Sequence, residues 1–251
     1  MDTIFSNRSA LVVGGSGGIG KAIVLALARR GVQLYIHGGH SKARLDSTLQ
    51  EVQEIQTKLG LPLKQQQHKA LLHPISGTES VQVFLDSAPQ VDILICAFGP
   101  FMRKAIPQMT ADDWKFLSDT NLAFPGALVS AYVGPMLTQQ WGRILLFGGT
   151  NTDSIRGFTS TTAYSAAKTG LGVLAKSIAR IGGPVNVTCN VICPGMTDTE
   201  YLDEQARRYA IEKAPGGTLL QCEEIAETAL GVLKNHHQNG TVIALDRGLV
   251  I

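Results

Sequence analysis

The chain has 251 residues, 44% of them hydrophobic, and its 22 basic and 20 acidic side chains leave a formal charge of +2. A chain of this size can bury one extended α/β core, and without a basic block or an acidic tail it shows no feature that would bind nucleic acid or an anionic membrane. No apolar run approaches the roughly 18 residues that a membrane-spanning helix needs, so we expect a soluble, cytoplasmic protein.

Short apolar runs alternate with longer segments of helical periodicity. The runs predicted to be strands are residues 9–15, 32–37, 69–74, 91–99, 142–149, 186–193 and 241–246. Most are apolar on both faces, as strands are when helices cover both sides of a sheet. The alternation predicts a Rossmann-like, doubly wound parallel α/β sheet of about seven strands, in a single domain over residues 1–251.

The first predicted strand runs into a glycine-rich turn, VGGSGGIG, which is followed by a helical pattern. Glycine lets the backbone turn tightly and approach a ligand, and the free N–H groups at a helix start attract phosphate. The glycines are spaced G-x-x-x-G-x-G rather than G-x-G-x-x-G. Because the turn joins a first strand to a first helix, it predicts a nucleotide site. The residues expected to form it are Gly14, Ser16, Gly17, Gly18, Ile19 and Gly20.

The end of the second strand bears on which nucleotide is bound. An NAD site usually has an acid there for the ribose 2′-hydroxyl, but this chain has none between His37 and Asp46. Lys42 or Arg44 could instead bring positive charge to a 2′-phosphate, and Ser41 could donate a hydrogen bond. NADP(H) is therefore the expected cofactor, and the residues assigned to it here are His40, Ser41 and Lys42. The alternative is that Lys42 and Arg44 are only the solvated first turn of a helix.

Four cysteines stand at positions 96, 189, 193 and 222, without C-x-x-C pairs, and the six histidines show no ligand spacing. Buried, reduced thiols are the expected outcome, and no metal site is expected.

Tyr164 and Lys168 stand four residues apart in a helical segment, so their side chains share one face. A tyrosine hydroxyl normally titrates near pH 10, and a neighbouring positive charge would let it exchange protons closer to neutrality. Lys168 could supply that charge and also bind the ribose of a cofactor. Alone the pair is a weak signal, because such pairs occur by chance on many helices.

Together with its surroundings, the pair makes the chain resemble the short-chain dehydrogenase/reductase family almost from end to end. The matching elements are the turn Gly14 to Gly20, the segment ending in Asn121-Leu122, the pair Tyr164 and Lys168, the run Cys189 to Thr199, and the terminal Ala244 to Gly248. Within that family the chain is most similar to the branch of 3-oxoacyl-acyl-carrier-protein reductases and related NADP-dependent carbonyl reductases.

The resemblance implies a role for each matching residue. Tyr164 would be the general acid of carbonyl reduction, Lys168 its electrostatic partner and ribose anchor, and Asn121 the holder of a water that passes protons to Lys168. Further cofactor contacts would come from Ala97, Phe98, Gly99, Pro194, Gly195, Thr197 and Thr199.

The resemblance also implies a variable substrate lid near residues 196–217 and a small-molecule or acyl-thioester carbonyl substrate. It further implies a homo-oligomer, a dimer or tetramer, that pairs the helix near residues 109–138 and the helix carrying Tyr164.

The chain departs from the family's pattern close to these residues. Val13 stands where a threonine usually opens the glycine motif, His73-Pro74 replaces an acid near the adenine, and Cys96-Ala97-Phe98-Gly99 replaces Asn-Asn-Ala-Gly. The last change is expected to bring the Phe98 ring close to the cofactor.

The largest departure concerns the catalytic serine of the family. Aligning the start of the strand 142–149 places that position on Gly149, whereas counting back from Tyr164 reaches Asn151. Thr150 is the expected substrate donor because it has the same hydroxyl as serine, with Asn151 next and Thr152 or Ser154 further alternatives.

Two functions remain open at this stage. One is an NADPH-dependent oxidoreductase that reduces a 3-oxoacyl thioester or similar ketone to an alcohol, with tyrosine as general acid. The other is a cofactor-binding sensor or structural subunit with little or no catalysis. The departures from the family's pattern favour this second function. The complete set of Asn121, Tyr164 and Lys168 favours the enzyme.

Overall fold

The computed structural model describes residues 3–61, 67–88 and 90–249, and the strands in these ranges form one parallel sheet in the order β3-β2-β1-β4-β5-β6-β7. The strands are β1 (Ser9–Val13), β2 (Gln33–Gly38), β3 (Lys69–Leu72), β4 (Ile93–Cys96), β5 (Gly142–Phe147), β6 (Val187–Pro194) and β7 (Val242–Leu245). Each overlaps the run predicted for it, so the predicted Rossmann-like α/β fold is confirmed.

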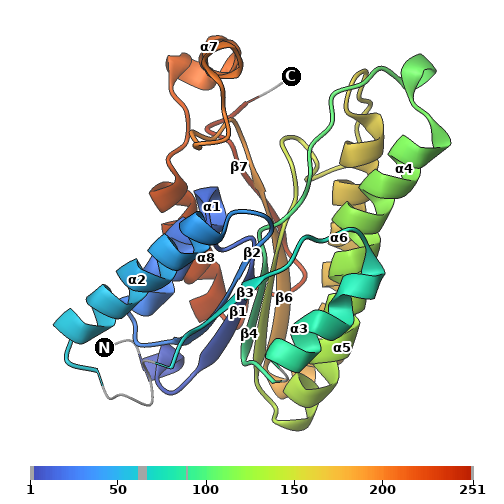
Figure 1. The fold of residues 1–251 in the computed structure, drawn as a ribbon. Coiled ribbons are helices and arrows are strands. Elements are labelled where there is room, and N and C mark those ends of the chain that lie inside the picture. Colours follow the sequence, from blue (N-terminus) through green and yellow to red (C-terminus); the bar gives the residue numbers. More distant parts are fainter. Residues whose placement is uncertain (1–2, 62–66, 89, 250–251) are drawn as a thin grey trace.

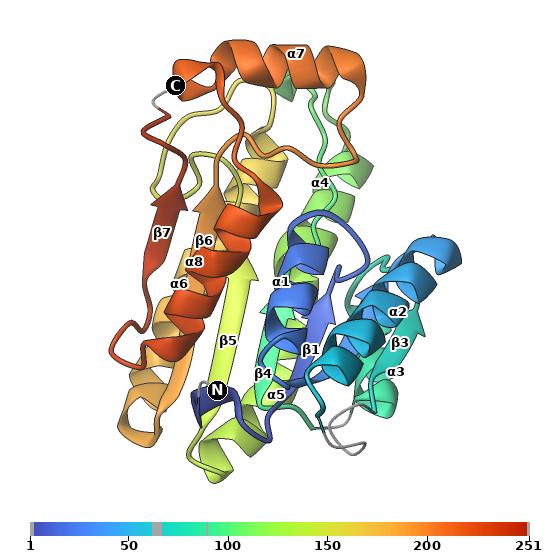
Figure 2. The same ribbon diagram turned by 90° about the vertical axis from the view of Figure 1, so that its left-hand side faces the viewer.

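Helices cover both faces of the sheet (Figure 1). One face carries α1 (Gly18–Ala28), α2 (Lys42–Lys58) and α8 (Cys222–Lys234), and the other carries α3 (Val81–Ser87), α4 (Ala111–Ser118), α5 (Phe124–Thr138) and α6 (Thr162–Gly182). Helix α7 (Glu204–Lys213) lies beyond the carboxyl ends of the strands (Figure 2). None of the helices in the described ranges is long and apolar enough to cross a bilayer.

The alternation of side chains along each central strand explains why both faces are covered. In β1, Ala10 and Val12 belong to the core beneath α1 and α8, whereas Leu11 and Val13 belong to the core beneath α5 and α6. All four side chains are fully buried. The edge strand β3 differs, because three of its four residues are exposed. Strands that are apolar on both faces therefore lie in the middle of the sheet, where helices cover both sides.

The order of the strands places a crevice between β1 and β4. From β1 the chain continues outward through β2 and β3, and it then returns to build the other half of the sheet from β4. At such a reversal, the loops that leave two neighbouring strands diverge, and ligands bind between them. Val13 pairs with Cys96 in the register of the two strands, and the Ala97 N–H donates to the Val13 carbonyl at 2.9 Å. The glycine turn therefore lies beside residues 97–99.

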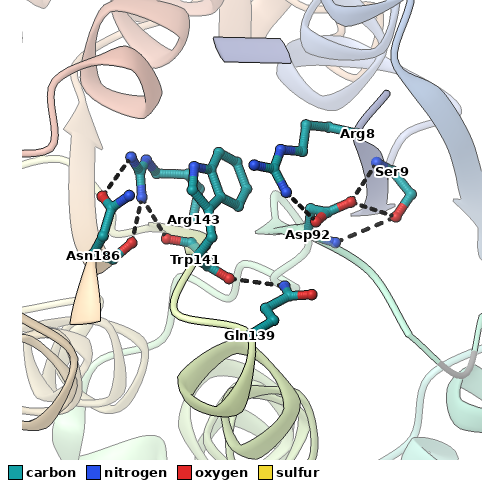
Figure 3. Close-up of polar contacts among 8 residues, drawn as sticks. Arg8, Ser9, Asp92, Gln139, Trp141, Arg143 and Asn186 are labelled. Carbon is teal, nitrogen blue, oxygen red and sulfur yellow. Dashed lines mark hydrogen bonds and ion pairs between the residues drawn. The ribbon is translucent and has the colours of Figure 1, made fainter. Parts of the chain in front are cut away.

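The opposite, amino end of the sheet is closed around Trp141 (Figure 3). The Trp141 ring lies between two guanidinium groups, with the Arg8 carbon 3.8 Å and the Arg143 carbon 4.6 Å from the ring centre. Arg143 is 1% exposed and donates to the carbonyls of Leu233 at 2.9 Å and Asn186 at 2.8 Å. Burial lowers the pKa of Arg143 to about 10, so it stays charged at neutral pH. This cation links the starts of β5 and β6 to the end of α8.

Candidate functional site

The predicted proton-transfer residues meet at the carboxyl end of the sheet. A Cβ added to Gly99, just after β4, would collide with both Lys168 Nζ and Asn121 Oδ1. A Cβ added to Gly149, just after β5, would lie 2.7 Å from the Tyr164 ring and 2.9 Å from its hydroxyl oxygen. Side chains from α6 and from the segment between α4 and α5 therefore converge on two glycines.

Lys168 is a buried cation without a carboxylate partner in the described part of the chain. Its side chain is 3% exposed and donates hydrogen bonds to the carbonyls of Phe147 at 2.9 Å and Phe98 at 3.3 Å. Burial lowers its pKa from 10.5 to about 8, which leaves most of the amine charged at neutral pH. An ammonium group has three donors, so one remains for a ligand.

Tyr164 presents a protonated hydroxyl. The side chain is half-buried, and its hydroxyl makes no hydrogen bond with the residues that the structure describes. Burial raises the pKa of Tyr164, and the neighbouring Cys193 adds to the rise. The lowering of the pKa expected from Lys168 does not offset this rise in the structure, where the ammonium nitrogen lies 5.9 Å from the ring centre. A hydroxyl that keeps its proton is suited to act as an acid.

Asn121 lies in a π-helical turn, Asp119–Ala123, that separates α4 from α5. Such widened turns occur frequently at functional sites. The amide is fully buried and donates through Nδ2 to the Pro100 carbonyl at 3.1 Å, while Oδ1 accepts no hydrogen bond from the described residues. A buried acceptor left open beside Lys168 is consistent with the expected water-holding role, which stays a prediction.

The turn after β5 contains the four candidate substrate donors, and three of them are already engaged. The Thr150 hydroxyl donates to the Pro194 carbonyl at 3.1 Å. The Thr152 hydroxyl accepts from the Gly149 N–H at 2.8 Å and donates to the carbonyl of the same glycine. Ser154 is exposed and accepts from a neighbouring arginine. Thr150 would have to leave its carbonyl partner to reach a substrate.

Asn151 differs from the other three candidates. It has a left-handed backbone with φ of 60° and is only 6% exposed. Its Oδ1 is buried without a partner, and its Nδ2 makes no hydrogen bond within the described ranges. Buried polar groups normally have partners, so this amide is ready to bind a ligand.

The glycine turn has the geometry of an anion site. Gly14 and Gly18 adopt positive φ angles of 81° and 50°, and a Cβ on Gly20 would overlap the Gly14 carbonyl. The Gly18 N–H donates to both carboxylate oxygens of Glu200, at 3.0 and 3.1 Å. The loop therefore holds an oxyanion at the start of α1, and it fits the pyrophosphate of a dinucleotide cofactor. The remaining predicted loop residues, Ser16, Gly17 and Ile19, belong to the same turn and its helix start.

The end of β2 presents one guanidinium group that is not paired with an acid in the described part of the chain. Ser41 caps α2 by accepting from the Arg44 N–H, and Lys42 pairs with Asp46 at 2.5 Å. The Arg44 guanidinium carbon instead lies 5.2 Å from the centre of the Tyr201 ring. His40 is exposed in the turn between β2 and α2. Of the two cations considered for this region, Lys42 and Arg44, only Arg44 is not paired with an acid in the described ranges.

The cofactor contacts expected after β4 and β6 also reach the crevice. The Phe98 carbonyl binds Lys168, whereas its ring packs edge-on against Phe124 of α5 with centres 6.4 Å apart. The aromatic ring expected beside the cofactor is thus turned toward the core. After β6, Thr197 donates to the Gly195 carbonyl, and the Thr199 methyl would lie 3.6 Å from a Cβ on Gly18.

Sequence reasoning missed His37, which supports the glycine turn from the end of β2. The Gly14 N–H donates to His37 Nδ1 at 3.1 Å, and His37 Nε2 lies 2.7 Å from the His73 carbonyl. Burial lowers the pKa of His37 to about 4, so the ring is neutral and accepts on Nδ1. The His37 ring thus gives the glycine turn a hydrogen-bond partner that Val13, which lacks the usual hydroxyl, does not supply. A histidine at the buried end of an apolar strand was the available signal.

Sequence reasoning also missed Glu200, the acid directly after the predicted cofactor residue Thr199. Among the described residues, no group of three or more His, Cys, Asp or Glu side chains is placed to hold a metal ion.

Fold, glycine turn and tyrosine–lysine pair define a nicotinamide-dependent oxidoreductase fold, and the family model for short chain dehydrogenases matches residues 8–210. The chain belongs to the short-chain dehydrogenase/reductase family. It is 27% identical to the 3-oxoacyl-[acyl-carrier-protein] reductase FabG of Chlamydia muridarum over 99% of this chain and 100% of that protein. It is 28% identical to the uncharacterized oxidoreductase YvaG of Bacillus subtilis, with 97% and 96% covered. A solved short chain dehydrogenase/reductase family protein superposes with a TM-score of 0.84 at 24% identity, covering 98% of both chains.

The lowered pKa of Lys168 predicts a pH-dependent stability difference. Between about pH 8 and 10.5 the unfolded chain binds more protons than the folded chain, so wild type gains stability as the pH rises. Relative to Lys168→Met, which lacks the titrating group, wild type should gain about 2 to 3 kcal/mol between pH 7 and 10 in the free energy of unfolding. Urea denaturation at a series of pH values measures this. Lys176→Met, an exposed lysine of the same helix, should run parallel to wild type; a parallel course for Lys168→Met would contradict the buried charge.

Proposed function

We propose that this protein is an NADPH-dependent reductase that converts a ketone, such as a 3-oxoacyl thioester, into an alcohol. The observation that carries the proposal is the convergence of Tyr164, Lys168 and Asn121 at the carboxyl end of the sheet, beside a glycine turn that binds an oxyanion. The substrate class is supported by relatives named as 3-oxoacyl-acyl-carrier-protein reductases.

The chain would hold the cofactor with the glycine turn, Arg44, Thr199 and Lys168, and the bound nicotinamide would supply the hydride. Tyr164 donates its proton to the substrate oxygen, because its raised pKa keeps the proton in place until that oxygen gains negative charge. The Lys168 ammonium then stabilises the phenolate that is left. Asn121 Oδ1 accepts a hydrogen bond from the water that returns a proton by way of Lys168.

Asn151 is our preferred donor to the substrate oxygen, with Thr150 as the alternative. The donor atom would be Asn151 Nδ2, which makes no hydrogen bond in the described ranges, whereas the Thr150 hydroxyl already donates to the Pro194 carbonyl. Gly149 leaves no room for the serine of the family, since a Cβ there would lie within 2.9 Å of the Tyr164 hydroxyl. The turn is therefore built to place a donor one or two residues later than usual.

An apolar substituent on the substrate suits the entrance to this site. Phe101, in the loop after β4, is 60% exposed, and its ring meets Tyr164 edge-to-face with centres 5.1 Å apart. From the same loop, the Arg103 guanidinium lies 4.8 Å from the ring centre of Tyr209 on α7. The aromatic ring next to the proton donor would pack against a hydrocarbon chain or a second ring.

Self-association is a further part of the proposal. Trp114 and Phe116 of α4 and Val173 and Ile181 of α6 are between 38% and 70% exposed, on the face of the sheet opposite α1. A dimer or tetramer that paired these helices would cover them.

Tyr164→Phe tests the catalytic proposal. Removing the proton donor should lower kcat roughly 10²- to 10⁴-fold, while the dissociation constant for NADPH stays nearly unchanged. NADPH consumption with 3-oxoacyl thioesters, diketones and quinones measures the rate, and protein fluorescence measures binding. Tyr35→Phe, which makes the same change in the middle of β2, serves as the control. If wild type binds NADPH and turns over none of these compounds, the protein is a cofactor-binding sensor or subunit instead.

A comparison of Asn151→Gly with Thr150→Val identifies the substrate donor. Glycine accepts the left-handed backbone at position 151, so only the amide is lost. We expect kcat/KM to fall roughly 100-fold in Asn151→Gly and less than tenfold in Thr150→Val. A larger loss in Thr150→Val would assign the role to Thr150, as the sequence first indicated.

Cofactor preference is tested at Arg44. A guanidinium that binds a 2′-phosphate should make NADPH bind more tightly than NADH, and Arg44→Ala should weaken NADPH roughly tenfold or more without changing NADH. Lys42→Ala should have a smaller effect, because Lys42 is paired with Asp46. Fluorescence titration gives all four constants for each protein. Tighter binding of NADH to wild type would refute the preference.

A further inference from the structure

The carboxylate of Glu200 occupies the anion position of the glycine turn. Its two oxygens lie 3.0 and 3.1 Å from the N–H of Gly18, the first residue of α1. The first N–H groups of a helix have no partner within the helix and carry partial positive charge, so they attract an anion. The chain thus supplies, from its own sequence, the kind of group that the turn would receive from a dinucleotide.

Tyr201 extends this cover over the turn. A Cβ on Gly17 would collide with the Tyr201 hydroxyl and with Glu200 Oε1, and one on Gly18 would lie 3.4 Å from the Tyr201 ring. Gly17 is buried as a result. The Arg44 guanidinium faces the same ring at 5.2 Å. Two consecutive side chains therefore cover the phosphate-binding backbone, and one of them also faces the cation proposed to choose the cofactor.

Both side chains belong to the segment that joins β6 to the lid helix α7, which lies across the carboxyl end of the sheet (Figure 2). The start of this segment is fixed, because Asp198 N–H donates to the Leu220 carbonyl and Leu220 N–H donates to the Met196 carbonyl, both at 2.8 Å. Glu200 lies beyond these anchors and is exposed. Its bonds to Gly18 can be exchanged for water or another anion without disturbing the sheet.

We propose that Glu200 is an internal competitor of the cofactor: it holds the glycine turn until a cofactor phosphate displaces it. This inference rests on the nucleotide cofactor of the proposed function. Because only the displaced state binds the phosphate, the occupied state lowers the apparent affinity in proportion to its population. Displacement also releases Tyr201 and the chain leading to α7 from the glycine turn, so binding of the cofactor is coupled to the mobility of this segment.

Glu200→Gln tests the competition by binding alone. The amide keeps the size of the side chain and removes its charge, so the dissociation constants of NADPH and NADP⁺ should fall roughly two- to fivefold. Isothermal titration calorimetry or protein fluorescence measures them without any substrate. Glu212→Gln is the matched control, since it makes the same change of net charge at an exposed position of α7. The dissociation constants of NADPH and NADP⁺ for Glu212→Gln should stay close to those for wild type.

Hydrogen–deuterium exchange gives a second readout that needs no turnover. Without cofactor, residues 196–213 should exchange faster in Glu200→Gln than in wild type or Glu212→Gln, because the lid has lost its contact with Gly18. Slower or equal exchange overturns the inference, as does a gain in affinity that Glu212→Gln shows equally.

The two proposals fail in different ways. If wild type binds NADPH and reduces a substrate while Glu200→Gln leaves affinity and exchange unchanged, only the competition is wrong. If neither wild type nor Glu200→Gln binds any nicotinamide dinucleotide, the proposed function is wrong as well. Binding by Glu200→Gln and not by wild type would support the competition in its strongest form.

Discussion

The need to satisfy the buried ammonium of Lys168 determines how the carboxyl end of this sheet is arranged. A desolvated cation without a nearby carboxylate is costly unless other polar groups replace its water. Here the carbonyls of Phe147 and Phe98 do so, and they come from the last residue of β5 and from the loop after β4. The bonds fix α6 relative to both strands, and Tyr164 lies one turn away on the same helix. Gly99 has to lack a side chain, because Lys168 and Asn121 occupy the space where one would stand.

Where the chain lacks a residue usual for its family, a nearby residue offers a polar group in its place. Val13 offers no hydroxyl to the glycine turn, and His37 accepts the hydrogen bond of Gly14 from the adjacent strand. Gly149 offers no hydroxyl to a substrate, and the turn that follows brings Asn151 into a buried position with an open amide. The first replacement comes from a neighbouring strand, and the second comes from two residues further along the same turn.

The sequence predicted the strands well because burial on two faces leaves a plain apolar run. It overextended some of them: residues 97–99 continue the apolar run of β4 but leave the ladder to line the crevice. The residues expected at the site were brought together because parallel strands end at one edge. The π turn at Asn121 had no such signal, and neither did the contact of Glu200 with Gly18, which depends on the meeting of separate elements. For His37 the signal was a histidine at the buried end of an apolar strand. The direction of the Tyr164 pKa was also missed, because burial depends on the whole fold.

Because of the buried Arg143 guanidinium, we expect the amino end of the sheet to resist local unfolding better than the carboxyl end. The donors of this guanidinium bind the backbone carbonyls of Leu233, Gly142 and Asn186, and the Arg143 side chain is almost completely buried. The contacts over the carboxyl end are made largely by exposed side chains such as Phe101, Tyr201 and Tyr209. Low-energy openings of the native state are therefore expected mainly at the carboxyl end of the sheet. Loops there can diverge in sequence between related chains at little cost to folding, which is how one scaffold comes to serve many substrates.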